Sequence, residues 1–418
     1  MFWRARIAVA ALFLSSLQFL TATESHATLY TFTSATFTNC GATGLNGPTY
    51  AACNSAYGTT WSSNSSLYGV TSGIQWWVVP RSGSYRLLAL GASGGTGITG
   101  AGLGASIQGM FNLTEGDVLR IAVGQLGLTS GAASGGGGGT FVWKSTETST
   151  PLVIAGGGGG GGYGTGDQNG KTTTSGGAGG NGGGWASGIG GAGGTSGGAG
   201  ICGTGGQSGC NTGGGGGWIA NATGGVPGSG LPGLFVGGGT LGGFGGGGGG
   251  FISGGNSAGG GGGGYSGGGG GGWGSSGNYV GGSGGGGGSY NSGTSQTNSA
   301  GINTGAGSFQ ITLVTPLASA TSISLSFPNG LSNVKYRAQV ALQANVGSDG
   351  PVTFFINGKR IARCISVQST SGVATCNWIP ATRGAVKVSA QVKPTNSSFL
   401  AATSDIATVN VLQRTGTR

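Results

Sequence analysis

The 418-residue sequence predicts an all-β protein with a long glycine-rich insertion. Apolar residues occur in short or alternating runs separated by Gly, Ser, Asn and Thr, and no segment shows a convincing 3.6-residue period. Glycine accounts for 108 residues, and most of its tracts of five to seven consecutive glycines lie between residues 156 and 290. After residue 315 an ordinary β-like composition returns. We therefore expect two β-sandwiches, the first of which carries a region built from glycine.

The first 27 residues have the pattern of a signal peptide. Arg4 and Arg6 precede an apolar run over residues 7–14, and Ser25-His26-Ala27 forms a small-x-small cleavage sequence. The apolar run is far shorter than the roughly 20 residues that cross a bilayer. We expect a mature chain that begins near Thr28, is secreted or surface-exposed, and contains no membrane span.

The cysteines fall into pairs that are close in sequence. Export places them in an oxidising compartment, where such pairs form disulfides. Each bond is expected to contribute roughly 2 to 3 kcal/mol by restricting the unfolded chain. No CxxC spacing is present, so no metal site is predicted. The predicted pairs are Cys40 with Cys53, Cys202 with Cys210, and Cys364 with Cys376.

Catalytic side chains are scarce. His26, the single histidine, lies in the predicted signal peptide, so the mature chain lacks Ser/His/Asp and Cys/His catalysis. Glu115 and Asp117 are the only close carboxylate pair, and LTEGDVL is interpreted as a polar turn between two strands. The sequence therefore predicts no enzyme, no cofactor and no metal.

The region over residues 28–155 reads as an antiparallel sandwich. Its strand-like runs are TLYTFTSATF, GIQWWVVP, YRLLALGA, SIQGMFNL, VLRIAVGQ, TFVW and PLVIA. Another strand, GSFQITLV, follows the glycine-rich region at residues 307–314.

The glycine tracts do not match a phosphate-binding loop, since none ends in Gly-Lys-Ser/Thr, and they lack the strict period of collagen. Polyglycine can form an extended left-handed helix with three residues per turn, and without Cβ atoms such helices can pack side by side. Backbone groups then bond to neighbouring helices. Aromatic residues punctuate the region, either as ligand contacts or as caps of the glycine helices. The candidates are Trp185, Trp218, Tyr265 and Trp273.

Residues 316–418 have the composition of a separate β-domain with immunoglobulin-like strand spacing and an Asn357-Gly358 hairpin turn. Ten of the fifteen Lys and Arg residues of the mature chain lie here, against two carboxylates. Lys359, Arg360 and Arg363 are candidates for a polyanion-binding patch, and the alternative is a solvated basic face. Aromatic residues do not interleave with these cations, so no nucleic acid partner is expected.

Several non-glycine motifs are similar to the glycine-rich extracellular domain of the anaplastic lymphoma kinase and leukocyte tyrosine kinase receptors. They are FTNCGATGLNGPTYAACNSAY, GIQWWVVP, YRLLALGASGG, MFNLTEGDVLRIAVGQLG, GGGGGTFVW and LVIAGGGGGGGYG, and the resemblance covers about residues 36–314. It implies a receptor-type domain over residues 28–315: a tumour-necrosis-factor-like β-sandwich of residues 28–155 and 307–315, with a polyglycine-helix bundle inserted at residues 156–306. Cys40 and Cys53 match the first cysteine pair of the family. Kinase motifs are absent, so a receptor tyrosine kinase label rests on this one domain.

Residues 316–418 resemble the immunoglobulin-like repeats of bacterial surface proteins, and glycine bundles of a similar kind occur in bacteriophage adhesins. We predict a secreted or surface-exposed, non-enzymatic recognition and adhesion scaffold, whose partner is an unknown surface polymer, glycan or protein receptor. The alternative is a self-assembling coat or matrix protein. A saturable ligand site favours the first hypothesis, and concentration-dependent assembly without ligand favours the second.

Overall fold

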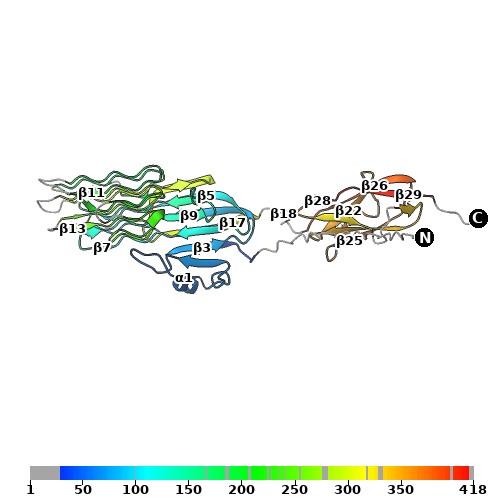
Figure 1. The fold of residues 1–418 in the computed structure, drawn as a ribbon, viewed down its shortest axis with the longest axis horizontal. Helices are drawn as coiled ribbons and strands as arrows, with labels where there is room; N and C mark the ends of the chain where they lie inside the picture. Colours follow the sequence, from blue (N-terminus) through cyan, green and yellow to red (C-terminus); the bar gives the residue numbers. More distant parts are fainter. Residues whose placement is uncertain are drawn as a thin grey trace, which may run out of the picture. The chain divides into compact units, whose positions relative to one another are not determined.

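The protein is described by a computed structural model and forms two compact units, Thr28–Leu317 and Ala318–Arg418 (Figure 1). The prediction of an all-β class is confirmed, because almost all regular structure is strand. The predicted signal peptide and Trp185 lie outside the described residues. Those residues are 29–98, 100–164, 166, 168–183, 188–205, 209–223, 226, 228–233, 235–239, 241–253, 256–274, 281–316, 319–327, 333–395 and 399–413.

Two antiparallel sheets form the sandwich of the N-terminal unit. The five-stranded sheet has the order β1-β17-β4-β5-β16, and the six-stranded sheet has the order β15-β10-β9-β6-β3-β2. Strands of the first are β1 (Ser34–Phe37), β4 (Gly83–Leu90), β5 (Gly104–Leu113), β16 (Thr294–Asn303) and β17 (Ser308–Pro316). Strands of the second are β2 (Tyr68–Thr71), β3 (Ile74–Val78), β6 (Val118–Ala122), β9 (Thr140–Lys144), β10 (Val153–Ala155) and β15 (Tyr290–Asn291).

Alternation of apolar and polar residues along the strands builds the sandwich core. In β4 the residues Tyr85, Leu87 and Ala89 are buried, while the residues between them face outward. Phe37 of β1 and Phe309 of β17 stack with ring centroids 5.8 Å apart. Side chains of the six-stranded sheet enter the same cluster, so one core joins both sheets.

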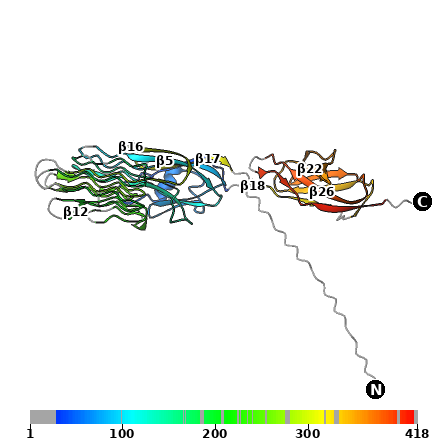
Figure 2. The ribbon, with the colours of Figure 1, turned by 90° about the horizontal axis from the view of Figure 1, so that it is seen from above.

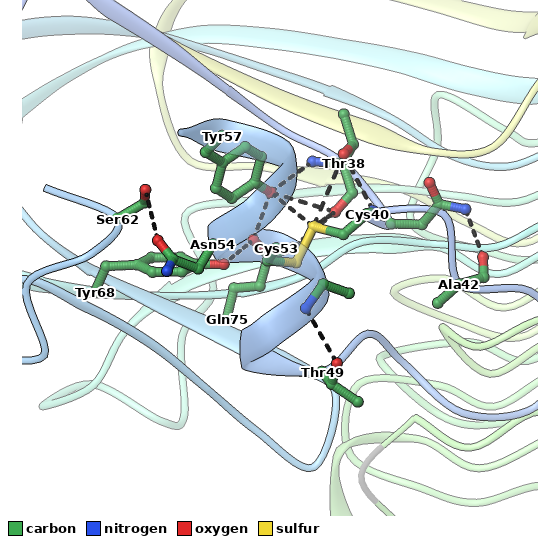
Figure 3. Close-up of a disulfide and its surroundings, with 12 residues drawn as sticks. Thr38, Cys40, Ala42, Thr49, Cys53, Asn54, Tyr57, Ser62, Tyr68 and Gln75 are labelled. Carbon is green, nitrogen blue, oxygen red and sulfur yellow. Dashed lines mark hydrogen bonds between the residues drawn. A yellow bond between two sulfur atoms is a disulfide. The ribbon is translucent and has the colours of Figure 1, made fainter. Parts of the chain in front are cut away.

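A short helix, α1 (Tyr50–Tyr57), forms in a segment whose sequence shows no convincing 3.6-residue period. Thr49 caps its N-terminus, with the Thr49 hydroxyl accepting from the Ala52 amide, and Gly58 ends it in a left-handed conformation. The helix carries Cys53, which is bonded to Cys40 (Figure 3). The Cys202–Cys210 and Cys364–Cys376 disulfides are present as well, so all three predicted pairs are confirmed.

A buried hydrogen-bond network surrounds the Cys40–Cys53 disulfide (Figure 3). The hydroxyls of Tyr57 and Tyr68 donate to Oε1 of Gln75 at 2.7 and 2.9 Å, and Nε2 of Gln75 donates to the Thr38 carbonyl at 2.8 Å. Burial raises the pKa of both phenols above the usual value, so they remain neutral donors. Together the disulfide and the network attach α1 and the loop after β1 to the sandwich.

The glycine tracts form a bundle of extended segments that run alongside one another beyond the sandwich strands (Figure 1). The backbone amides of residues 259–264 donate hydrogen bonds to three neighbouring segments in turn. Gly259 and Gly262 donate to Gly282 and Gly285, Gly260 and Gly263 to Ser134 and Gly137, and Gly261 and Gly264 to Gly213 and Gly216. The partner segment thus recurs at every third residue. We interpret this as the three-residue period of the extended polyglycine helix.

The same segment accepts hydrogen bonds from other parts of the bundle. Amides of Gly157 and Gly160 donate to its carbonyls, as do those of Gly268 and Gly271, and Gly248 donates to Gly261. Three segments therefore accept its amides and three further segments donate to its carbonyls. Nearly every polar backbone group of a tract that has no side chains is satisfied by a neighbour.

The bundle does not coincide with the expected insertion of residues 156–306. Glycine segments before residue 156 join it: Gly158 donates to Ala92, and Gly136 donates to Gly248. At the other end, residues 290–303 leave the bundle, because β15 pairs with β10 and β16 pairs with β5. Figure 2 shows β16 beside β5. The segment expected as the insertion therefore includes the sheet strands β15 and β16 as well as glycine segments. Strand β16 is an exposed polar edge strand, so it lacks the apolar alternation that marks a half-buried strand.

Short elements connect the bundle segments. They are β7 (Thr129–Ser130), β8 (Ala133–Ser134), β11 (Gly203–Thr204), β12 (Cys210–Thr212), β13 (Phe251–Ser253), β14 (Asn256–Ala258) and the 3₁₀ helix η1 (Leu231–Gly233). Strand β7 pairs with β8, β11 with β12 and β13 with β14.

The C-terminal unit is a second two-sheet sandwich, with one sheet of order β19-β21-β25 and another whose main path is β20-β29-β26-β22-β23. Its core includes Leu342, Phe354, Trp378 and Val388. Strands β18 and β27 pair in parallel, β24 pairs with β22, and β28 pairs with β26. The bounds are β18 (Ser319–Ala320), β19 (Ile323–Ser326), β20 (Asn333–Lys335), β21 (Val340–Val346), β22 (Pro351–Ile356), β23 (Lys359–Arg360), β24 (Val367–Gln368), β25 (Val373–Trp378), β26 (Gly384–Val392), β27 (Phe399–Leu400), β28 (Ala402–Thr403) and β29 (Ala407–Leu412).

Candidate functional site

Trp218, a candidate ligand contact, lies inside the molecule. Its side chain is 1% exposed and packs on the outer face of the six-stranded sheet against Trp143, with ring centroids 5.5 Å apart. Phe235 stacks on Phe141 of the same face at 4.1 Å. Aromatic residues of the glycine-rich region therefore attach the bundle to the sandwich. This agrees with the capping alternative for Trp218 and leaves no surface for a ligand there.

Tyr265 and Trp273 are half-buried and occupy different places in the bundle. Tyr265 stacks on Tyr290 at 4.9 Å and accepts a bond at its carbonyl from the Trp218 amide. Trp273 packs edge-on against Phe251 at 5.8 Å, and its indole N–H donates to the Asn256 carbonyl at 3.4 Å. The structure thus brings Tyr265 near Trp218 but not into one surface with Trp273.

The three basic candidates lie at or beside the edge strand β23 of the C-terminal unit. Asn357 and Gly358 form the predicted two-residue turn, with φ of 47° and 77°, the left-handed values that a type I′ turn requires. Asn357 also accepts the Lys387 amide through its side chain at 2.8 Å, which fixes the turn to β26. Lys359, Arg360 and Arg363 are all exposed.

Strand register separates Lys359 from Arg360. Arg360 lies opposite Phe355, and Lys359 lies opposite Ile356, so their side chains leave opposite faces of the sheet. Phe355 lies opposite Ser389 of β26, and Lys387 shares the outward face with Ser389. Arg360 and Lys387 therefore face the same side. We call Lys359, Arg360, Arg363 and Lys387 the basic edge.

Sequence reasoning missed Lys387, which is 24 residues beyond Arg363 in the chain. The signal that pointed to it was the alternation in AVKVSAQV, which places Lys387 on the solvent face of a strand. It also missed the Tyr336 ring, over which the Arg337 and Arg383 guanidinium groups lie at 5.3 and 5.1 Å from the centroid. Pairing of β20, β29 and β26 brings these residues together.

Carboxylates do not neutralise the basic edge. Within the described part of the C-terminal unit, no Lys or Arg nitrogen lies within 4.0 Å of a carboxylate oxygen. Asp349 instead stabilises a turn, because its carboxylate accepts hydrogen bonds from the Ser369 hydroxyl at 2.7 Å and from the Gly372 amide at 3.0 Å. These hydrogen bonds, from Ser369 first, hold the pKa of Asp349 below its usual value.

Among the described residues, no cluster of side chains suited to acid–base catalysis occurs. Asp117 accepts the Thr114 amide and forms an ion pair with Lys144 at 3.0 Å, as expected for a polar turn between β5 and β6. No group of three or more His, Cys, Asp or Glu side chains that could hold a metal ion occurs among the residues with assigned positions. Helices of the described chain are also too short to cross a membrane.

Comparison with known proteins shows a partial similarity to a receptor. No family model matches the chain. A stretch of 95 residues, 22% of this chain, is 37% identical to the leukocyte tyrosine kinase receptor of Mus musculus. The chain spans about a tenth of that receptor's length, since the match covers 11% of it. A segment of the chain is thus distantly similar to a segment of this receptor, and the three disulfides fit the oxidising extracellular environment that such a receptor segment implies.

Proposed function

We propose that the protein is an extracellular, non-enzymatic recognition and adhesion scaffold whose basic edge binds an anionic surface polymer. One observation carries the proposal: four exposed cations lie along the β22–β23 edge and the adjoining β26, and no carboxylate of the described residues lies within 4.0 Å of them. Unpaired cations at a sheet edge attract polyanions over a range set by the Debye length. In the N-terminal unit, the hydrogen-bonded glycine bundle supplies a stiff body for presentation.

The test uses the full mature chain and immobilised heparin. We compare Arg360→Gln/Lys387→Gln with Lys335→Gln/Lys393→Gln, which removes the same charge from exposed residues elsewhere in the unit. The first pair is expected to weaken binding and flatten its salt dependence, and the second is not. Equal weakening by both pairs shows that net charge, and not the basic edge, determines binding. Lipopolysaccharide and teichoic acid then replace heparin to rank envelope polymers.

A matrix role has one observation in its favour. Strand β16 is a ten-residue edge strand that pairs with β5 on one side only, and edge strands can pair with a second chain. Sedimentation velocity over a range of concentrations distinguishes the two functions. Assembly that grows with concentration in the absence of polymer favours the matrix role, and a monomer that binds heparin saturably favours the scaffold.

A further inference from the structure

A hollow of about 360 Å³ opens on the outer face of the six-stranded sheet. It lies between the β2–β3 turn, strand β6, the end of β9 and η1. Arg120 of β6, the buried Trp143 of β9 and the aliphatic Ile74 and Leu231 line it. The hydroxyl-bearing side chains of the lining are Thr71, Ser72, Ser145 and Thr148. Its volume is at the lower end of the range for small-molecule sites, which suits one ring-sized group.

Strand pairing fixes Arg120 in the middle of an aromatic row. Trp76 of β3 lies opposite Arg120 on one side, and Trp143 lies opposite it on the other, so all three side chains share one face. Arg120 is half-buried, yet no carboxylate of the described chain lies within 4.0 Å of its guanidinium. A cation that is partly withdrawn from water and has no partner favours an anionic ligand.

The hydroxyl groups around the hollow are accessible. Thr71, Ser72 and Thr148 are exposed and Ser145 is half-buried, and their side chains make no hydrogen bond with a described residue. Ser72 and Gly73 form a two-residue turn with φ of 49° and 78°, so Ser72 is held at the rim by a tight hairpin. Hydroxyls that both donate and accept match the hydroxyls of a sugar, while the half-buried Leu231 in the lining suits its C–H face.

The charge balance selects the type of anion. Arg120 is the one cation among the residues that line the hollow. Glu147 is exposed in the loop between Ser145 and Thr148 and adds a negative charge near the rim. A phosphate monoester, with roughly −1.5 to −2 charges, requires more positive charge than this. A carboxylate carries one charge and matches the planar guanidinium fork in a bidentate pair.

From this geometry we propose that the hollow binds one carboxylate-bearing sugar residue, of the uronic acid type, in an extracellular polysaccharide. Arg120 holds the carboxylate, the four hydroxyl side chains bond to the sugar hydroxyls, and Leu231 contacts the ring. This site is on the N-terminal unit and does not use the basic edge. Its recognition is stereochemical, whereas attraction at the basic edge is mainly by charge.

The experiment measures binding of trigalacturonate and of its methyl ester by calorimetry. The ester has the same ring and hydroxyls but no charge. All measurements use the full mature chain with the basic edge neutralised by glutamine substitutions, so binding there does not contribute. The acid form is expected to bind at least tenfold more tightly than the ester, because a hydrogen bond to a charged group is stronger than a neutral one.

Variants then locate the site. Arg120→Gln is expected to weaken trigalacturonate binding about ten- to hundredfold, Arg120→Lys by less, and Thr148→Val about two- to tenfold. Arg86→Gln, which removes an exposed arginine from β4 on the five-stranded sheet, is the matched control and is expected to change affinity less than twofold. Glu147→Gln is expected to strengthen binding about twofold. Unchanged thermal unfolding of Arg120→Gln verifies that its fold is intact.

Three results overturn the proposal: no binding of trigalacturonate, equal binding of the acid and the ester, or equal loss in Arg120→Gln and Arg86→Gln. Preference for a sulfated trisaccharide over trigalacturonate also overturns the carboxylate assignment. None of these results affects the heparin comparison at the basic edge, which concerns residues of the other unit. The two proposals therefore fail separately.

Discussion

The sandwich core and the glycine bundle of the N-terminal unit fill their interiors in opposite ways. In the core, large side chains such as Phe37, Leu87 and Phe309 are fully buried between two sheets. In the bundle, the buried positions of residues 259–264 carry no side chains, and neighbouring backbones bond to one another directly. The core excludes water with apolar surface, and the bundle does so by close approach of peptide groups.

The difference predicts which kind of substitution destabilises each region. Ordering glycine is entropically expensive, at roughly 1 to 2 kcal/mol per residue, and no buried side chain offsets this cost in the bundle. Each backbone hydrogen bond returns a net of about 1 kcal/mol, so stability requires that nearly all of them form. The core should therefore be sensitive to lost volume, and the bundle to added volume.

The largest effect is expected from Phe309→Ala in the core. This change removes a fully buried ring that stacks on Phe37, and it leaves a cavity in the core between the two sheets. The free energy of unfolding of the N-terminal unit should fall by about 3 to 5 kcal/mol in denaturant titrations. A loss below 1 kcal/mol contradicts a core that is packed by side chains.

Gly262→Ala tests the bundle. A Cβ atom at this position would lie 2.3 Å from the Gly157 carbonyl oxygen, and both groups belong to backbones that cannot rotate away. We expect a loss of about 3 kcal/mol, at the upper end for overpacking, and faster hydrogen exchange of the amides over residues 259–264. Gly305→Ala is the control, because its nearest neighbour would be 3.8 Å away. Equal effects of the two substitutions contradict a close-packed bundle.

Replacing Cys40 and Cys53 by serine should cost about 2 to 3 kcal/mol, because the disulfide closes a loop of 13 residues that is otherwise free in the unfolded chain. The effect should concentrate on α1 and the strand β1, and bundle amides should retain their protection. Hydrogen exchange of the oxidised protein and the serine variant measures both. Loss of protection throughout the bundle contradicts the separation of the two regions.

Alkaline pH is expected to lower the stability of the sandwich core in the unmutated protein. Near neutral pH, tyrosine ionisation is expected to have no effect on stability. Burial raises the pKa of Tyr85 to about 12, and it also raises the pKa values of Tyr30, Tyr57 and Tyr68. Because unfolded tyrosine deprotonates near pH 10, this contribution is complete below pH 10 and is lost as the pH rises toward the folded pKa values. Denaturant midpoints between pH 9 and 11.5 should fall, and less steeply in Tyr85→Phe. Midpoints that do not change over this range contradict the assignment.

Sequence patterns predicted features that depend on nearby residues. The all-β class follows from two-residue alternation, the three disulfides from short cysteine spacings, and the Asn357-Gly358 turn from the φ values that only such residues adopt readily. Helix α1 was missed because its eight residues are stabilised by Thr49 and the Cys53 disulfide, not by an amphipathic pattern. The residues of the candidate sites were harder to predict from the sequence, because Lys387 and Tyr336 reach their neighbours only through strand pairing.

By itself, the sequence determined the strand period, the local cysteine pairs, the absence of histidine after residue 26 and the concentration of positive charge after residue 315. Only the tertiary structure decided that β16 completes the five-stranded sheet and that Trp218 covers the six-stranded sheet. It also decided that Arg120 and Ser72 line the same hollow. The physical reason is that a glycine tract has no side chains to specify its neighbours. Which segment lies beside which is set by chain connectivity and by the requirement that every buried peptide group find a partner.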